Sequence, residues 1–196
     1  LVIGRRTFRN VTLGATRTEA GGFDTNVVSD GAVGYIGWRP GPAGSTGGAS
    51  LGHVTARLSK LVIAAGKKSE VVDVLQTPSR QYPAFEVAID NFYMGEIKLG
   101  RLEFAAANTG AGASAAWQLS RLEVTNPDMK VSAKGDWSPT SAGTRRMRIN
   151  FAFDAIDAGA TLGRFGIPGA VSRGHGKLEG KLEWIGSPLE IDYPTL

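Results

Sequence analysis

Apolar residues recur at every second position over long stretches of this 196-residue chain. Such alternation places the apolar side chains on one face of a pleated strand and the polar side chains on the other. Clear examples cover residues 85–90, 129–134, 146–153 and 177–184. One apolar and one polar face are typical of an antiparallel sheet that is covered on one side. The pattern therefore predicts a mainly β fold built on a large, curved or twisted antiparallel sheet.

One arrangement of strands and turns occurs twice, over residues 9–38 and again over residues 101–137. Each copy consists of a strand, a polar turn, an aromatic residue, further strand, a glycine and a tryptophan. Repetition of this kind is typical of β structures in which each unit needs a neighbour to cover its apolar face. We expect residues 1–196 to form a single β-rich unit, with a soft boundary near 77–83 between the two repeat-like halves.

Two segments interrupt the strand pattern. Between Asp154 and Phe165 the apolar residues approach helical spacing, Asp157 is suited to cap the segment, and Gly166 ends it. This predicts one short helix near 155–166 that packs on the sheet through Ile156, Leu162 and Phe165. Residues 68–75 fit either a helical turn or a loop. The Gly/Pro-rich residues 40–48 predict a mobile surface loop, and residues 126–128 predict a tight turn.

The composition narrows the classes of function. Hydrophobic residues make up 42% of the chain, charged residues make up 20%, and the net charge is +4. Lys and Glu alternate over residues 177–183, which indicates a solvated strand face and argues against nucleic-acid binding. The absence of Cys excludes disulfides, thiol nucleophiles and Cys-based zinc sites. No apolar run approaches the ~20 residues that span a bilayer.

Candidate catalytic and metal-binding residues are sparse. His53 and His175 are the only histidines, and neither has a second ligand at metal-binding spacing. There is no Gly-x-Ser-x-Gly nucleophile motif, and residues 41–48 lack the ending of a phosphate-binding loop. The basic residues at 145–148 fit a solvated strand end better than a site for anionic headgroups. We therefore expect no catalytic residue, no metal and no cofactor.

Several short motifs follow one another in a specific order and spacing over residues 82–196. They are Pro83-Ala84-Phe85, Leu99-Gly100-Arg101-Leu102, Trp117-Gln118-Leu119, Gly135-Asp136-Trp137, Leu162-Gly163-Arg164-Phe165-Gly166, Gly174-His175-Gly176, Leu182-Glu183-Trp184, Gly186-Ser187-Pro188 and Tyr193-Pro194-Thr195-Leu196. In this combination the stretch resembles the C-terminal region of YhdP-type proteins in the AsmA-like superfamily. Residues 31–36 and 58–61 extend the resemblance more weakly into the first 81 residues.

The resemblance implies a large Gram-negative envelope protein that one N-terminal helix anchors in the inner membrane. Its periplasmic part would be an extended β-sheet groove with an apolar lining. The implied role is phospholipid transport between the membranes and maintenance of the outer-membrane barrier, without catalytic residues. The chain begins without Met, inside a strand-like segment. We therefore expect it to be a piece of such a protein, which contacts the membrane only through the missing anchor, with phospholipid acyl chains and other envelope proteins as partners.

The residues of the expected apolar face are the candidates for lipid contact or for plain core. They are Phe85, Val87, Ile89, Leu102, Phe104, Met129, Val131, Met147, Ile149, Phe151, Phe153, Leu182 and Trp184. Core is the more common role for such a face, because something must cover it. The four tryptophans fit strand-end packing better than ligand binding. Two alternatives remain open, namely a β-rich ligand- or carbohydrate-binding module and an architectural segment that docks partner proteins.

Overall fold

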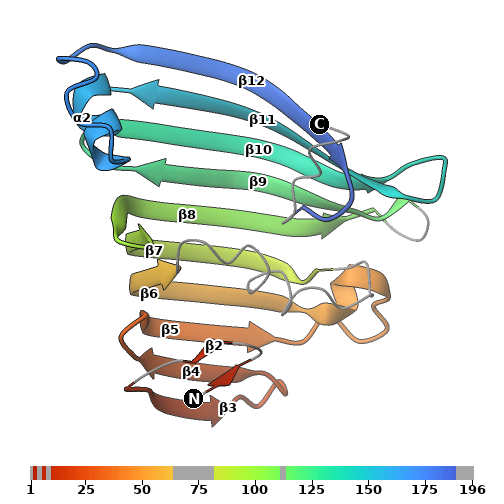
Figure 1. The fold of residues 1–196 in the computed structure, drawn as a ribbon. Coiled ribbons are helices and arrows are strands. Elements are labelled where there is room, and N and C mark those ends of the chain that lie inside the picture. The colour runs from red at the N-terminus through yellow and green to blue at the C-terminus, as the bar shows by residue number, and fades with distance from the viewer. Residues whose placement is uncertain (1, 4–5, 8–9, 64–81, 111–113, 189–196) are drawn as a thin grey trace.

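The fold is mainly β, as expected, and consists of one large open sheet with one short α-helix (Figure 1). The computed structural model describes residues 2–3, 6–7, 10–63, 82–110 and 114–188. The strands are β1 (Val2–Ile3), β2 (Arg6–Thr7), β3 (Thr12–Arg17), β4 (Phe23–Val28), β5 (Ala32–Arg39), β6 (His53–Ile63), β7 (Ala84–Met94), β8 (Ile97–Thr109), β9 (Ala116–Thr125), β10 (Met129–Pro139), β11 (Arg145–Ala155) and β12 (Gly176–Ile185).

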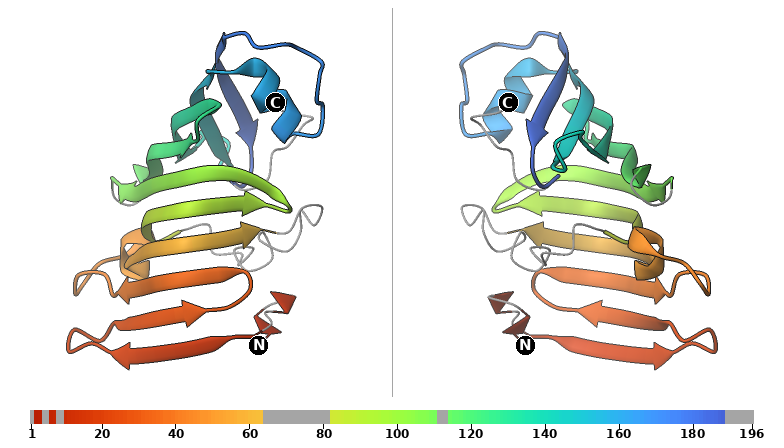
Figure 2. Two further views of the ribbon diagram at one scale, coloured as in Figure 1. Left: turned by 90° about the vertical axis from the view of Figure 1, so that its left-hand side faces the viewer. Right: turned by 90° about the vertical axis from the view of Figure 1, so that its right-hand side faces the viewer.

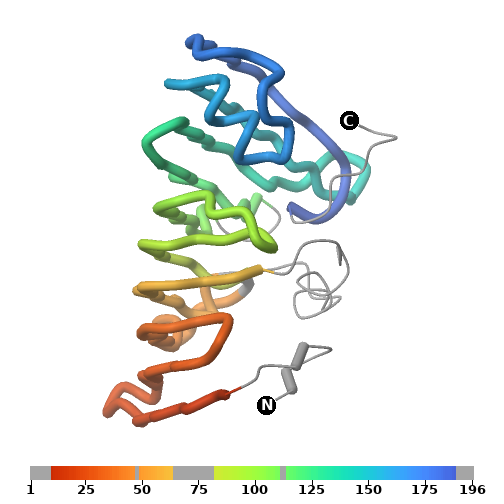
Figure 3. Tube along the Cα trace, turned by 60° about the vertical axis from the view of Figure 1, so that its left-hand side comes forward, coloured from red at the N-terminus to blue at the C-terminus, as the bar shows by residue number. Residues whose placement is uncertain are grey.

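Strands β3 to β12 form a ten-stranded sheet in which spatial order follows chain order, while β1 and β2 pair separately. Figure 3 shows this order as an unbroken run of colour along the stack. Neighbouring strands are antiparallel, except that β6 and β7 run parallel. The expected antiparallel arrangement does not hold at this pair, so the sheet is mixed. A parallel neighbour requires a crossover, which replaces the hairpin that joins antiparallel strands.

Residues 64–81, between β6 and β7, lie outside the described residues. The predicted helical turn or loop at 68–75 falls there, as does most of the predicted boundary near 77–83. The described strands on both sides of this segment belong to the same sheet.

The sheet is strongly twisted. In Figure 2, β3 to β6 lie nearly level while β12 crosses the same view steeply. Two of its register shifts lie at glycines, Gly34 in β5 and Gly135 in β10. A Cβ on Gly34 would lie 2.3 Å from the Arg57 carbonyl oxygen, and its φ of +143° suits glycine. A Cβ on Gly135 would lie 2.1 Å from the Arg148 carbonyl oxygen. These bulges accommodate the twist and permit close approach of the neighbouring strand.

The predicted helix is confirmed as α2 (Ala158–Arg164), which is shorter than the interval 155–166. The Asp157 side chain accepts a hydrogen bond from the Ala160 N–H at 2.9 Å and caps the helix. The buried residue of the helix is Thr161, whose hydroxyl donates to the Asp128 carbonyl oxygen at 3.0 Å. Ile156 and Phe165, which were expected to pack on the sheet, are 45% and 46% exposed. The helix is therefore held largely by polar contacts.

Two predicted connections are seen in detail. The Gly/Pro-rich segment at 40–48 is not wholly irregular, because it runs into the 3-10 helix η1 (Gly47–Leu51). The turn between β9 and β10 is closed by Asn126, whose side-chain oxygen accepts from the N–H groups of Asp128 at 2.9 Å and Met129 at 3.1 Å. This Asx arrangement explains the tight connection.

Candidate functional site

The apolar side chains of the sheet share one face, which we call the apolar face. Its central line, which we call the apolar row, crosses all ten strands through directly paired residues. These are Leu13, Val27, Gly34, Leu58, Ile89, Leu102, Val124, Val131, Phe153 and Leu178. At ~4.8 Å per strand spacing, nine spacings extend over roughly 43 Å. The apolar face is therefore continuous from one edge of the sheet to the other.

The pairing register places every candidate residue named from the sequence on this face. Each of them faces another member or a small residue on the next strand, as in the pairs Val87 with Phe104 and Ile149 with Leu182. Ile89, Met129, Met147 and Trp184 are the most deeply buried, at 1–2% exposure. The face therefore combines packed positions with accessible ones.

An aromatic cluster covers one end of the apolar face, where β9 to β12 meet the start of β7. We define it as Tyr82, Trp117, Trp137 and Trp184 with Met147, all of which belong to one buried cluster. The Tyr82 ring lies 5.6 Å from the Trp117 ring and 5.2 Å from the Trp137 ring. Tyr82 precedes its strand and reaches across β8 to these tryptophans, so it acts as a cover for the cluster.

The chain after β12 completes this cover. The Trp137 indole N–H donates to the Gly186 carbonyl oxygen at 2.6 Å, and the Trp184 indole N–H donates to the Ser187 carbonyl oxygen at 2.8 Å. The Ser187 hydroxyl also lies 3.2 Å from the Tyr82 hydroxyl. The indole N–H groups are thus satisfied inside the apolar cluster. Sequence reasoning missed Tyr82 and Ser187, because contacts across 105 positions leave no local pattern.

The opposite end of the apolar face leaves large apolar side chains accessible around α2 and the loop that follows it. Ile156, Phe165, Ile167, Val171 and Leu178 are each at least 44% exposed. Figure 2 shows α2 on the side toward which the upper strands curl. Arg164 holds the helix in place, since it donates to the Lys98 carbonyl oxygen at 2.9 Å and forms an ion pair with Asp128.

The opposite face of the sheet, which we call the polar face, is crossed by ion pairs between neighbouring strands. Examples are Asp24 with Arg39 at 2.6 Å and Asp136 with Arg148 at 2.8 Å. Hydrogen bonds from Arg101 and then Arg121 hold the pKa of Glu103 below its ordinary value. This face is solvated and balanced in charge, as the alternation of Lys and Glu predicted.

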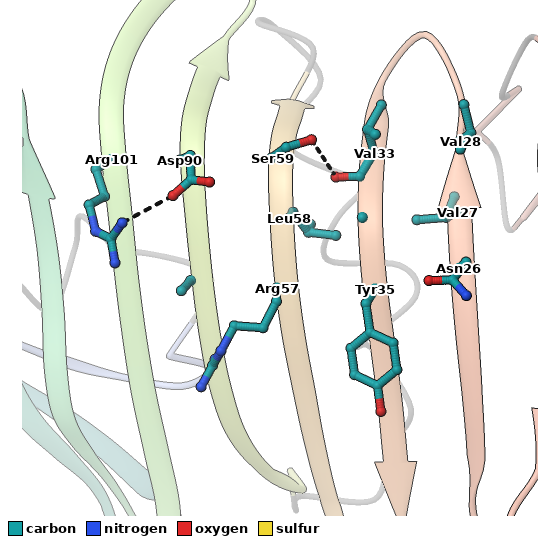
Figure 4. A pocket seen from close by; sticks show the side chains of 12 residues that line it. Asn26, Val27, Val28, Val33, Tyr35, Arg57, Leu58, Ser59, Asp90 and Arg101 are labelled. Atoms are coloured by element: carbon teal, nitrogen blue, oxygen red, sulfur yellow. Dashed lines mark hydrogen bonds and ion pairs between the residues drawn. The ribbon is translucent and has the colours of Figure 1, made fainter.

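Two shallow hollows lie on the polar face. The larger, of about 570 Å³, extends over β4 to β8 above Gly34 and Ala88. Figure 4 shows Arg101 paired with Asp90 on one side of it, and the Ser59 hydroxyl bonded to the Val33 carbonyl on the other. The second, of about 410 Å³, is lined by residues of β9 to β12. Neither hollow is lined by a histidine.

The remaining candidates from the sequence, the histidines and the tryptophans, lie in different environments. His53 and His175 are both exposed, one at the start of β6 and the other in the loop before β12. Trp117, Trp137 and Trp184 are at most 5% exposed, which agrees with strand-end packing. Within the described part of the chain no group of three or more His, Cys, Asp or Glu residues is placed to hold a metal ion.

Comparison with known proteins identifies the family. The family model described as YhdP protein matches residues 1–196. The chain belongs to the YhdP family. This membership places it among the AsmA-like proteins and points to the envelope of a Gram-negative bacterium. Neither the search of curated proteins nor the search of solved structures found a match.

The match covers both halves of the sheet, so the weaker resemblance of the first 81 residues is supported together with the stronger one. In the described ranges of this YhdP-family chain, no helix has the length and apolar character needed to cross a membrane.

Proposed function

We propose that this chain is a non-catalytic segment of a periplasmic, inner-membrane-anchored YhdP protein, and that its apolar face guides phospholipid acyl chains between the inner and outer membranes. The observation that carries the proposal is the apolar row, which crosses all ten strands without a charged residue. An acyl chain needs such an uninterrupted surface, because each methylene moved out of water contributes ~0.8 kcal/mol. No cofactor takes part in this function.

The exposure along the apolar row supports a path with accessible ends. Leu13 is 50% exposed and Leu178 is 58% exposed, whereas Ile89 near the middle is 1% exposed. The half-exposed side chains at the ends of the row remain available to a ligand. The aromatic cluster, in contrast, is already filled by the protein's own side chains. We therefore place the acyl chains at the two accessible ends of the apolar row. We exclude them from the aromatic cluster and from the centre of the row, where Leu58 and Ile89 are packed.

A carbohydrate-binding module is less well supported. Such modules stack sugars on exposed aromatic rings, whereas Trp117, Trp137 and Trp184 are buried. The exposed Phe23 ring instead stacks on Trp38 at 5.5 Å. A purely architectural role would leave the apolar face without ligand, and the experiment below distinguishes the two.

The test is native mass spectrometry of the chain purified from a Gram-negative host, with lipid extraction of the same sample. We expect co-purified phospholipid. The variant Phe151→Glu places a charge beside the apolar row and should abolish the bound lipid, because burying an unpaired carboxylate is costly. The matched control is Asn150→Glu, which adds the same charge at an exposed position on the polar face.

Circular dichroism establishes whether each variant folds. If Phe151→Glu does not fold, Leu13→Glu serves instead, because Leu13 is half exposed and contributes little to the core. A ligand-free mass for the wild-type chain would contradict the proposal and would support the architectural role.

A further inference from the structure

The edge of β12 that pairs with no other strand of the described chain has a sequence that is complementary to itself. On the polar face β12 presents Lys177, Glu179, Lys181 and Glu183, and on the apolar face it presents Leu178 and Leu182, with Gly180 at the centre. We propose that β12 pairs antiparallel with β12 of a second copy about a two-fold axis at Gly180. The sheet would then continue across the axis into the partner.

The charges support this register. Directly opposite residues of an antiparallel pair lie on the same face. A two-fold axis at Gly180 places Lys177 opposite Glu183 of the second copy, and Glu179 opposite Lys181 of the second copy. Shifting the axis by one residue in either direction places Glu179 or Lys181 opposite its own copy. Like charges directly opposite each other are destabilising. Shifting the axis by two residues keeps only one of the two kinds of opposite-charge contact, so the register centred on Gly180 is favoured.

The intramolecular pairing of β12 supports the same conclusion. Lys177 pairs with Asp154 at 3.6 Å and Glu183 pairs with Arg146 at 2.8 Å. The two charged residues beside Gly180 have no charged residue opposite them on β11, because Glu179 lies opposite Ala152 and Lys181 lies opposite Asn150. Among the described residues neither Glu179 nor Lys181 takes part in an ion pair. A second copy would supply the partners that β11 does not.

The apolar side of β12 is also suited to a second copy. Leu178 is 58% exposed, and in the proposed register it lies opposite Leu182 of the partner. The Phe151 ring already lies across Gly180, since a Cβ there would be 2.9 Å from the ring. Two copies would therefore place two phenylalanine rings beside the axis, over the glycine pair, and would continue the apolar face from one copy into the next.

The length and regularity of β12 suit it to such a pair. The strand is ten residues long, contains no proline, and pairs with β11 without a register shift. Edge strands that avoid association are usually short, bulged, interrupted by proline or charged. The charges of β12 alternate in sign, so a second copy in the proposed register neutralises them. Within the described chain no strand lies beyond β12. An isologous two-fold contact is also the commonest form of homodimer.

The test uses charge reversal with sedimentation velocity of the full chain over a concentration series. We expect the wild-type chain to dimerise. Glu179→Lys and Lys181→Glu each create two like-charge contacts by symmetry, so each alone should weaken the dimer at least tenfold. An equimolar mixture of the two variants should restore dimerisation, because the opposite charges then face each other again. Recovery in the mixture cannot arise from misfolding of either variant.

Matched controls carry the same change of charge at positions away from the edge. Glu96→Lys lies in the turn between β7 and β8, and Lys134→Glu lies on the polar face of β10. Both should dimerise as the wild type does. A wild-type monomer across the whole series would overturn the proposal. So would a dimer that survives both edge variants, since it would use another surface.

Crosslinking tests the register independently, because the chain contains no cysteine. Glu179→Cys mixed with Lys181→Cys should form a disulfide on oxidation, since directly opposite residues have Cβ atoms ~4.5–5.5 Å apart. Either variant alone should remain largely uncrosslinked. Equal crosslinking in the separate samples would contradict the register. Bound phospholipid is measured separately, so failure of the dimer would leave the proposed function standing.

Discussion

The two copies of the repeat form the same local structure but differ in what covers it. In the first copy Phe23 on β4 pairs with Trp38 on β5, and in the second Trp117 on β9 pairs with Trp137 on β10. Phe23 is 46% exposed, whereas Trp117 and Trp137 are each 5% exposed. The repeat therefore specifies an aromatic pair at corresponding strand ends without specifying its burial.

The difference arises from residues outside the repeat. Tyr82 and the segment at Gly186–Ser187 cover the second aromatic pair. The β3–β5 end of the sheet, in contrast, presents its apolar side chains partly to solvent, as Leu13 and Phe23 show. One sheet thus contains a region that packs on its own chain and a region that leaves apolar surface available. The proposed lipid path depends on the second kind of region.

Replacing one aromatic residue in each copy gives the largest expected contrast. Trp137→Ala should lower the free energy of unfolding by about 3–5 kcal/mol, because it removes a buried indole and leaves a cavity. Phe23→Ala should lower it by no more than about 1 kcal/mol, because half of that side chain is already exposed. Urea unfolding followed by circular dichroism measures both. Equal losses would show that the first pair is covered as well.

Replacing the bulge glycines tests the close approach of neighbouring strands in each copy. Gly34→Ala should destabilise the chain by at least about 1–3 kcal/mol, since alanine is strained at its φ and would contact the Arg57 carbonyl. Gly135→Ala should also be destabilising, through its close approach to the Arg148 carbonyl. The matched control is Gly14→Ala in β3, which has no atom within 4 Å of the added Cβ. It should be neutral or slightly stabilising. A neutral Gly34→Ala would contradict the role of the bulge.

Weakening the attachment of α2 should affect the helix and its surroundings and not the β3–β5 end of the sheet. Arg164→Gln removes the ion pair with Asp128 and should lower the free energy of unfolding by about 1–3 kcal/mol, because it leaves a partly buried carboxylate without its partner. Hydrogen exchange should increase in α2 and remain unchanged in β3 to β5. Arg148→Gln is the control, because its partner Asp136 belongs to a more exposed pair. Uniform exchange changes across the sheet would refute the local effect.

Lowering the pH should produce the smallest change in stability, and it should act through carboxylates of the polar face in both copies of the repeat. Hydrogen bonds from Arg39 lower the pKa of Asp24, and those from Arg101 and Arg121 lower the pKa of Glu103. A folded pKa below the unfolded value means that ionisation stabilises the fold above the unfolded pKa, and that this contribution is lost as pH falls through the folded pKa.

For Glu103 the loss should therefore begin below its ordinary value of 4.5. Glu103→Gln should flatten the dependence of stability on pH between 4.5 and lower values. Unfolding midpoints measured across that range for the wild type and the variant check this. An unchanged slope in Glu103→Gln would contradict the assignment.

The alternation of apolar and polar residues was sufficient to predict the sheet and its two faces. Alternation is a local property of each strand, and the pairing register then places the apolar residues of neighbouring strands on the same face. The parallel pair of β6 and β7, the aromatic cover by Tyr82 and Ser187, and the polar attachment of α2 were not predictable in this way. Each depends on contacts between residues distant in sequence, as with Arg164 and Lys98.

The central claim is that lipid occupies the apolar face and not the polar face, which photocrosslinking along β5 tests directly. A photoreactive phenylalanine analogue would replace Ile36 on the apolar face and, in a separate variant, Tyr35 on the polar face. After irradiation of cells grown with labelled phospholipid, we expect label on the Ile36 variant and little on the Tyr35 variant. Equal labelling at both positions, or none at Ile36 in a folded variant, would contradict the account.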